Sequence, residues 1–113
     1  MSMDPNWEVS VQDVDAMRKR GEAFLLLDVR QPEEFAICKI DGAHLIPLGE
    51  LEGRADDVRG LAKGLPIVAQ CHHGGRSLSA AAILRRAGVA DVKSMAGGID
   101  QWSLQVDTSV PRY

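Results

Sequence analysis

Residues 71–77 (sequence CHHGGRS) combine a thiol, two glycines and a cation in one short stretch. Gly74 and Gly75 permit backbone conformations that other residues resist, so a tight loop here can turn several N–H groups toward one point. Hydrogen bonds from those groups favour the ionised form of the Cys71 side chain, and the thiolate is the nucleophilic form of cysteine. We therefore predict that Cys71 is a catalytic nucleophile.

The side chains that follow Cys71 fit an anionic substrate. Arg76 comes after four intervening residues and carries a permanent charge on a forked set of N–H groups, which suits an oxyanion. The two adjacent histidines are expected to add hydrogen-bond donors or partial positive charge. The predicted substrate-binding residues are His72, His73, Gly74, Gly75, Arg76 and Ser77.

The flanking segments predict a strand before the loop and a helix after it. An apolar run over residues 66–69 leads into Cys71, and an alanine- and leucine-rich stretch runs from Arg76 or Ser77 to Ala87. In open α/β sheets, ligands bind beyond the carboxyl ends of strands. The first turn of the helix adds its own free N–H groups and the positive end of its dipole. The loop is therefore expected to form an anion cradle.

Alternation of strand and helix patterns continues along the chain. Ser10 is a candidate N-cap for a helix over residues 11–20, and Pro32 suits the first turn of another. Further helices are predicted over 51–63 and 99–104, and strands over 7–9, 24–29, 43–46 and 89–95. Short strands that alternate with helices predict an α/β fold around a largely parallel sheet.

The composition is that of a single soluble domain. The chain has 113 residues, of which 45% are hydrophobic and 26% charged, and its net charge is −3. These values exclude a disordered chain, a collagen and a membrane-spanning bundle. The slightly acidic balance lacks the basic footprint of a nucleic-acid-binding protein, so neither nucleic acid nor membrane is an expected partner.

The first residues show no basic region followed by an apolar run, so we expect no secretory signal. No lipidation motif is visible. Two cysteines do not form a disulfide framework, which favours a cytoplasmic location with both thiols free. No metal is expected, because adjacent histidines cannot readily share a tetrahedral site and no paired ligand motif exists.

Two residues outside the loop, Asp28 and Arg30, are candidates for supporting roles. Asp28 and Arg30 are expected to fix a loop at a strand end, with Glu34 as a candidate partner of Arg30; a substrate-facing role for Arg30 stays open. Cys38 is expected to be a packed thiol. A redox pairing with Cys71 would need the two Cα atoms to lie within about 7 Å.

Residues 71–77 resemble the active-site loop of the rhodanese sulfurtransferases. The sequence LLDVR at 26–30 with PEEF at 32–35, GA at 42–43 with IP at 46–47, and GGI at 97–99 with Trp102 resemble other motifs of that family. The resemblance runs from about Val11 to Trp102. It departs from the family pattern at residues 38–41 (CKID), so no histidine role is transferred there. The ending after Trp102 resembles rhodanese domains attached to adenylating enzymes of molybdopterin and thiamine synthesis.

The resemblance implies one rhodanese domain over residues 1–113, with a three-layer fold whose central sheet is flanked by helices. It implies that Cys71 takes sulfane sulfur from thiosulfate or a related persulfide donor and passes it to a thiol or cyanide. No cofactor is implied, and a sulfur-carrier protein is a candidate partner. Two alternatives stay open: a non-catalytic or relay sulfur-carrier module, and a phosphatase or arsenate-handling enzyme. Because the related phosphatases have a loop one residue longer, the loop length favours sulfur transfer.

Overall fold

The computed structural model describes residues 7–113; residues 1–6, where the sequence predicts no secretory signal, lie outside the described part. Within it, the strands form one sheet in the order β1-β5-β4-β2-β3, and every pairing is parallel. This confirms the predicted α/β class. The strands are β1 (Glu8–Val9), β2 (Leu25–Asp28), β3 (His44–Leu45), β4 (Ile67–Gln70) and β5 (Val92–Met95).

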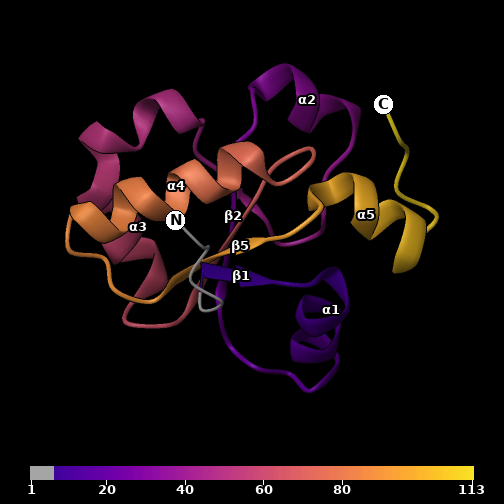
Figure 1. Ribbon diagram of the computed structural model, residues 1–113, viewed down its shortest axis with the longest axis horizontal. Coiled ribbons are helices and arrows are strands. Elements are labelled where there is room, and N and C mark those ends of the chain that lie inside the picture. The colour runs from indigo at the N-terminus through magenta and orange to yellow at the C-terminus, as the bar shows by residue number, and fades with distance from the viewer. Residues whose placement is uncertain (1–6) are drawn as a thin grey trace.

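Helices cover both faces of the sheet and give a three-layer molecule. Figure 1 shows α3 and α4 on one side of the strands and α1 and α5 on the other. The shorter α2 lies near one end of the sheet. The helices are α1 (Val11–Lys19), α2 (Pro32–Ile37), α3 (Ala55–Ala62), α4 (Gly75–Arg86) and α5 (Gly98–Gln105).

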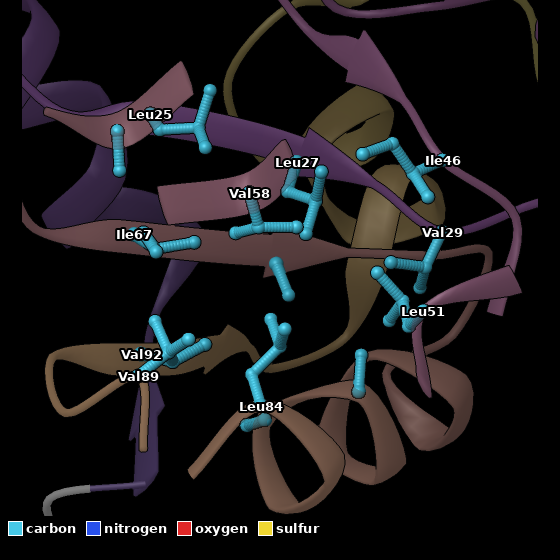
Figure 2. Packing of buried hydrophobic residues seen from close by; sticks show 14 of the residues in the cluster. Leu25, Leu27, Val29, Ile46, Leu51, Val58, Ile67, Leu84, Val89 and Val92 are labelled. Atoms are coloured by element: carbon cyan, nitrogen blue, oxygen red, sulfur yellow. The ribbon is translucent and has the colours of Figure 1, made fainter. Parts of the chain in front are cut away.

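Side chains that alternate along the strands divide the core into two clusters. Leu25 and Leu27 of β2 pack in the cluster beneath α3 and α4, which Figure 2 shows from close by. Leu26 lies in the second cluster, with apolar residues of α1 and α5. Because β2 and β4 are buried on both faces, they form continuous apolar runs in the sequence.

The expected element boundaries hold at some ends and shift at others. Ser10 caps α1 as predicted, because its side chain accepts a hydrogen bond from the Asp13 amide. The helix predicted over 51–63 is shorter: tight 3₁₀ turns at Leu48–Glu50 and Glu52–Arg54 precede α3. Two glycines weaken the helical preference of that region, which agrees with the later start. Among residues 7–113, no helix is long and apolar enough to cross a bilayer.

The strand register brings the segments of the candidate site to one edge of the sheet. Asp28, the last residue of β2, pairs with Gln70, the last residue of β4. Both strands therefore end side by side, and residues 71–74 leave the sheet next to the segment that leads into α2. Parallel sheets commonly bind ligands at this edge.

Candidate active site

The loop after β4 directs main-chain amides at the sulfur of Cys71. The amides of Gly74 and Ser77 donate to Sγ at 3.0 and 3.3 Å. Gly74, with φ of +109°, is the residue before α4, and only glycine adopts this conformation readily. The sulfur therefore lies at the N-terminus of α4, where the helix dipole favours negative charge. The Cys71 residue itself is only 1% exposed and packs into the core beneath the loop.

The start of α5 holds the loop in this orientation. The amides of Ile99 and Asp100 bind the carbonyl oxygens of Cys71 and His72, at 2.8 and 3.1 Å. A Cβ atom at Gly98, whose φ is +60°, would lie 2.4 Å from both of those oxygens. The close approach therefore requires glycine at position 98. The sequence motif drew attention to this glycine, but its contact with the loop could not be read from it.

Two buried serines lie beneath the loop. The Ser77 hydroxyl lies 3.5 Å from the Cys71 sulfur, 3.1 Å from the Gly74 carbonyl oxygen and 2.7 Å from the Ser94 hydroxyl. Neither serine is exposed. Ser77 therefore supports the sulfur and the loop from inside. Ser94, in β5, is a further supporting residue that no sequence motif indicated. Its only signal was a polar residue in a buried strand.

Arg76 forms a two-pronged ion pair with Glu34 of α2. Its Nη1 and Nη2 atoms lie 2.6 and 2.9 Å from the two carboxylate oxygens. The hydrogen bonds from Arg76 hold the pKa of Glu34 well below its usual range, and Glu34 in turn raises the pKa of Arg76. The fork that was predicted to hold a substrate oxyanion is thus occupied by a carboxylate of the protein itself.

Arg30 forms its ion pair with Asp28. It also contacts the predicted partner Glu34, but through the main-chain carbonyl oxygen of that residue, to which Nη1 donates at 3.4 Å, and not through its carboxylate. Its Nη2 donates to Asp28 at 2.7 Å and to the Cys38 carbonyl oxygen at 2.7 Å, and neither charged side chain is exposed. Burial alone would lower the pKa of Arg30, but hydrogen bonds to Asp28 and Tyr113 raise it above its ordinary value. The pair is sealed, which agrees with a supporting role and leaves Arg30 no open path to substrate.

Tyr113 joins the two ion pairs, and no sequence motif pointed to it. Its hydroxyl accepts from Arg30 at 3.0 Å and donates to Glu34 at 2.7 Å. Its ring lies parallel to His72, with centroids 4.0 Å apart and an interplanar angle of 8°. Burial, with a further contribution from Glu34, raises the pKa of Tyr113 to about 12. We call the four partly exposed side chains of Glu34, His72, Arg76 and Tyr113 the rim.

The two histidines differ in their surroundings. Burial, and after it the neighbouring His73, lowers the pKa of His72 from its ordinary value. The shift disfavours a positive charge on this ring, and the partial charge or donors expected from the two histidines stay a prediction. His73 is largely exposed, and its Nδ1 lies 3.8 Å from Asp100. Asp100 is bound mainly by Arg112, which lowers the pKa of that carboxyl.

Cys38 is the second buried thiol, and it lies away from the loop. It packs in the core cluster of α1 and α5, whereas Cys71 packs in the cluster of α3 and α4, on the other face of the sheet. Both cysteines are free. The structure therefore agrees with the packed thiol expected at position 38.

Fold and loop together define a class of protein: a parallel α/β domain that presents a cysteine in an amide-lined loop before a helix. Residues 10–105 match the model of the rhodanese-like domain, and the chain belongs to that family. Sulfur transfer in general is the chemistry that this membership supports. It agrees with the resemblance drawn from residues 71–77.

Two of the relatives and one solved structure carry sulfur transfer in their names. The chain is 33% identical to "Adenylyltransferase and sulfurtransferase MOCS3-2" of Zea mays over 93% of its own length and 23% of that protein. It is 36% identical to "Probable adenylyltransferase/sulfurtransferase MoeZ" of Mycobacterium tuberculosis over 82% of its length and 24% of that protein. The chain thus spans about a quarter of these curated relatives. The human single-domain sulfurtransferase TSTD1 superposes with a TM-score of 0.73 at 29% identity, covering 88% of this chain and 96% of that one.

Proposed function

We propose that this protein is a sulfurtransferase that carries sulfane sulfur as a persulfide on Cys71. The observation that carries the proposal is the pair of amides, from Gly74 and Ser77, that donate to Sγ at the start of α4. These donors stabilise a negatively charged sulfur, which is needed both before and after a sulfur atom is added. Residues 1–113 are proposed to act as one catalytic domain.

The reaction proposed for thiosulfate has two steps. The Cys71 thiolate attacks the outer sulfur, the sulfur–sulfur bond of thiosulfate breaks, and sulfite leaves with the electron pair of that bond. The terminal sulfur of the resulting persulfide carries the negative charge. Cyanide or an acceptor thiolate then takes this sulfur and regenerates the Cys71 thiolate, which gives ping-pong kinetics. Arg76 is proposed to hold the oxyanion of the donor.

A relay role is the second candidate, and the lengths of the relatives favour it. This chain corresponds to about a quarter of the adenylyltransferase and sulfurtransferase proteins. In that reading the domain receives sulfur from one protein and delivers it to another, with little turnover of free thiosulfate. The proposed acceptor is then a sulfur-carrier protein. A cytoplasmic location is part of the proposal in both readings, because both require a free thiol.

Persulfide formation tests the proposal directly. After incubation with thiosulfate, intact mass spectrometry should show one added sulfur on the wild type and on Cys38→Ser, and none on Cys71→Ser. Turnover with cyanide would support the enzyme, whereas loading without turnover would support the relay. An unloaded wild type that hydrolyses an aryl phosphate would overturn the proposal in favour of a phosphatase.

A further inference from the structure

The rim contains a carboxylate where an anionic donor would be expected to bind. Arg76 lies close enough to Cys71 that the charge of the sulfur contributes to raising the pKa of the guanidinium, behind the larger contributions of Glu34. Both terminal nitrogens of Arg76 are nevertheless engaged by Glu34. An oxyanion that needs the fork of Arg76 must therefore compete with a carboxylate that is already in place.

Glu34 is held in that place by more than Arg76. The amide of Gln31 donates to Oε1 at 3.0 Å, as part of a capping box at the start of α2. The Tyr113 hydroxyl donates to Oε2 at 2.7 Å. Glu34 thus accepts hydrogen bonds from three residues, and displacing it from Arg76 means working against a fixed side chain.

Tyr113 is itself anchored from beneath. Arg30 donates to its hydroxyl at 3.0 Å, and the guanidinium of Arg30 is fixed by Asp28 and by the carbonyl oxygen of Cys38. The other side of Tyr113 stacks on His72, the residue next to the nucleophile. A continuous chain of contacts therefore leads from the sealed ion pair, through Tyr113, to the carboxylate on Arg76.

We infer that Glu34, held by Tyr113, is a specificity-determining residue that occupies the oxyanion subsite of Arg76 and so disfavours sulfur donors that carry their sulfur on an oxyanion. Donors such as thiosulfate must displace the carboxylate, whereas persulfides of uncharged or bulky thiols reach Cys71 without using Arg76. The inference rests on the proposed function only for the identity of the substrates. The charge preference itself belongs to Cys71 and its rim.

A matched pair of alkylating reagents tests this preference without sulfur transfer. The Cys71 thiolate displaces iodide from iodoacetate, an anion, or from iodoacetamide, which is neutral, and forms a thioether in both cases. The ratio of the two rates, with the adduct assigned to Cys71 by peptide mass spectrometry, reports how the rim treats negative charge. Glu34→Gln keeps the shape of the side chain and removes its charge.

We expect Glu34→Gln to raise the iodoacetate-to-iodoacetamide ratio by at least about threefold, and to raise the rate of thiosulfate loading in the same direction. Glu33→Gln, a neighbouring exposed carboxylate of the same helix, is the matched control and should leave the ratio unchanged. In Glu34→Gln/Arg76→Ala the gain should disappear, because the cation that would bind the anion is gone. Tyr113→Phe keeps the ring and removes the hydroxyl, so a smaller increase is expected.

Two outcomes would overturn the inference: an unchanged ratio in Glu34→Gln and Tyr113→Phe, or an equal change with Glu33→Gln. An equal slowing of both reagents would show that Glu34 only supports the fold. If the ratio shifts as expected while no variant accepts sulfur, the charge preference stands and the sulfurtransferase proposal fails. If the variants accept sulfur while the ratio of the two alkylation rates stays unchanged, the sulfurtransferase proposal stands and the charge preference fails.

Discussion

Two arginine–carboxylate pairs lie at the same edge of the sheet, and they differ in burial. Asp28 and Arg30 are sealed from solvent, whereas the side chains of Glu34 and Arg76 are 18% and 34% exposed. A buried charge that loses its partner is strongly destabilising, and the contribution of an ion pair to stability falls as its exposure to solvent rises. The same chemistry therefore serves the fold in one pair and remains available to a ligand in the other.

The largest expected effect separates the two pairs by stability. Asp28→Asn leaves the buried Arg30 charge without its carboxylate, so we expect a loss of about 3 to 5 kcal/mol in the free energy of unfolding. Glu34→Gln makes the same chemical change in a pair that is partly exposed, and should cost distinctly less. Urea denaturation of both variants measures the difference. Equal losses would show that both ion pairs contribute equally to the stability of the fold, which would contradict the difference proposed between them.

At the rim, a substitution should change catalysis more than it changes stability. Arg76→Ala is expected to lower kcat/KM for thiosulfate at least tenfold, about 1.4 kcal/mol, because the oxyanion then lacks its cation. Its free energy of unfolding should fall less than that of Asp28→Asn, since the side chain of Arg76 is partly exposed. Steady-state kinetics with thiosulfate and cyanide, together with urea denaturation, provide both values. An unchanged kcat/KM would remove Arg76 from the mechanism.

The two pairs also differ in how far the sequence could predict them. The loop around Cys71 depends on glycines and a strand–helix junction that are contiguous in the chain, so its cradle could be predicted. Asp28 and Arg30 are two residues apart and were assigned a structural role. Glu34 was expected to bind Arg30, which is near in sequence, and it does so through its main-chain carbonyl oxygen, whereas its carboxylate binds Arg76, 42 residues away.

The part that sequence could not supply is the rim, because it joins side chains from distant segments. Tyr113 contacts Glu34 across 79 residues, and no local pattern predicts a contact between these two residues. The contact follows from where α2, α4 and the segment after α5 meet in space. Gly98 could be predicted in part. Its sequence motif is visible, but its closeness to the carbonyl oxygens of the loop depends on how α5 packs against residues 71–72 in the folded protein.

Titration of Tyr113 tests whether its hydroxyl connects the two ion pairs in solution. It is the one tyrosine of the chain, so phenolate absorbance reports it directly, and we expect a pKa of about 12. Because this pKa is raised above the ordinary 10.0, the protonated Tyr113 hydroxyl stabilises the folded protein. That contribution to the free energy of unfolding is fully present below pH 10 and is lost as the pH rises through about 12. Glu34→Gln should lower the pKa, since Glu34 contributes to raising it. An ordinary pKa in the wild type would mean that Tyr113 does not bridge the two pairs in solution.

The smallest effect is expected at Cys38, next to the sealed pair. Arg30 binds this residue through its carbonyl oxygen at 2.7 Å, and the thiol lies 4.0 Å from the guanidinium. Cys38→Ser keeps the carbonyl and changes one buried atom, so sulfur loading and turnover should stay within about twofold of the wild type, a difference below about 0.5 kcal/mol. Intact mass spectrometry and cyanide-dependent turnover compare the two proteins. A large loss of loading would show that the thiol of Cys38 takes part in the chemistry, and the sealed pair would then belong to the reaction as well as to the fold.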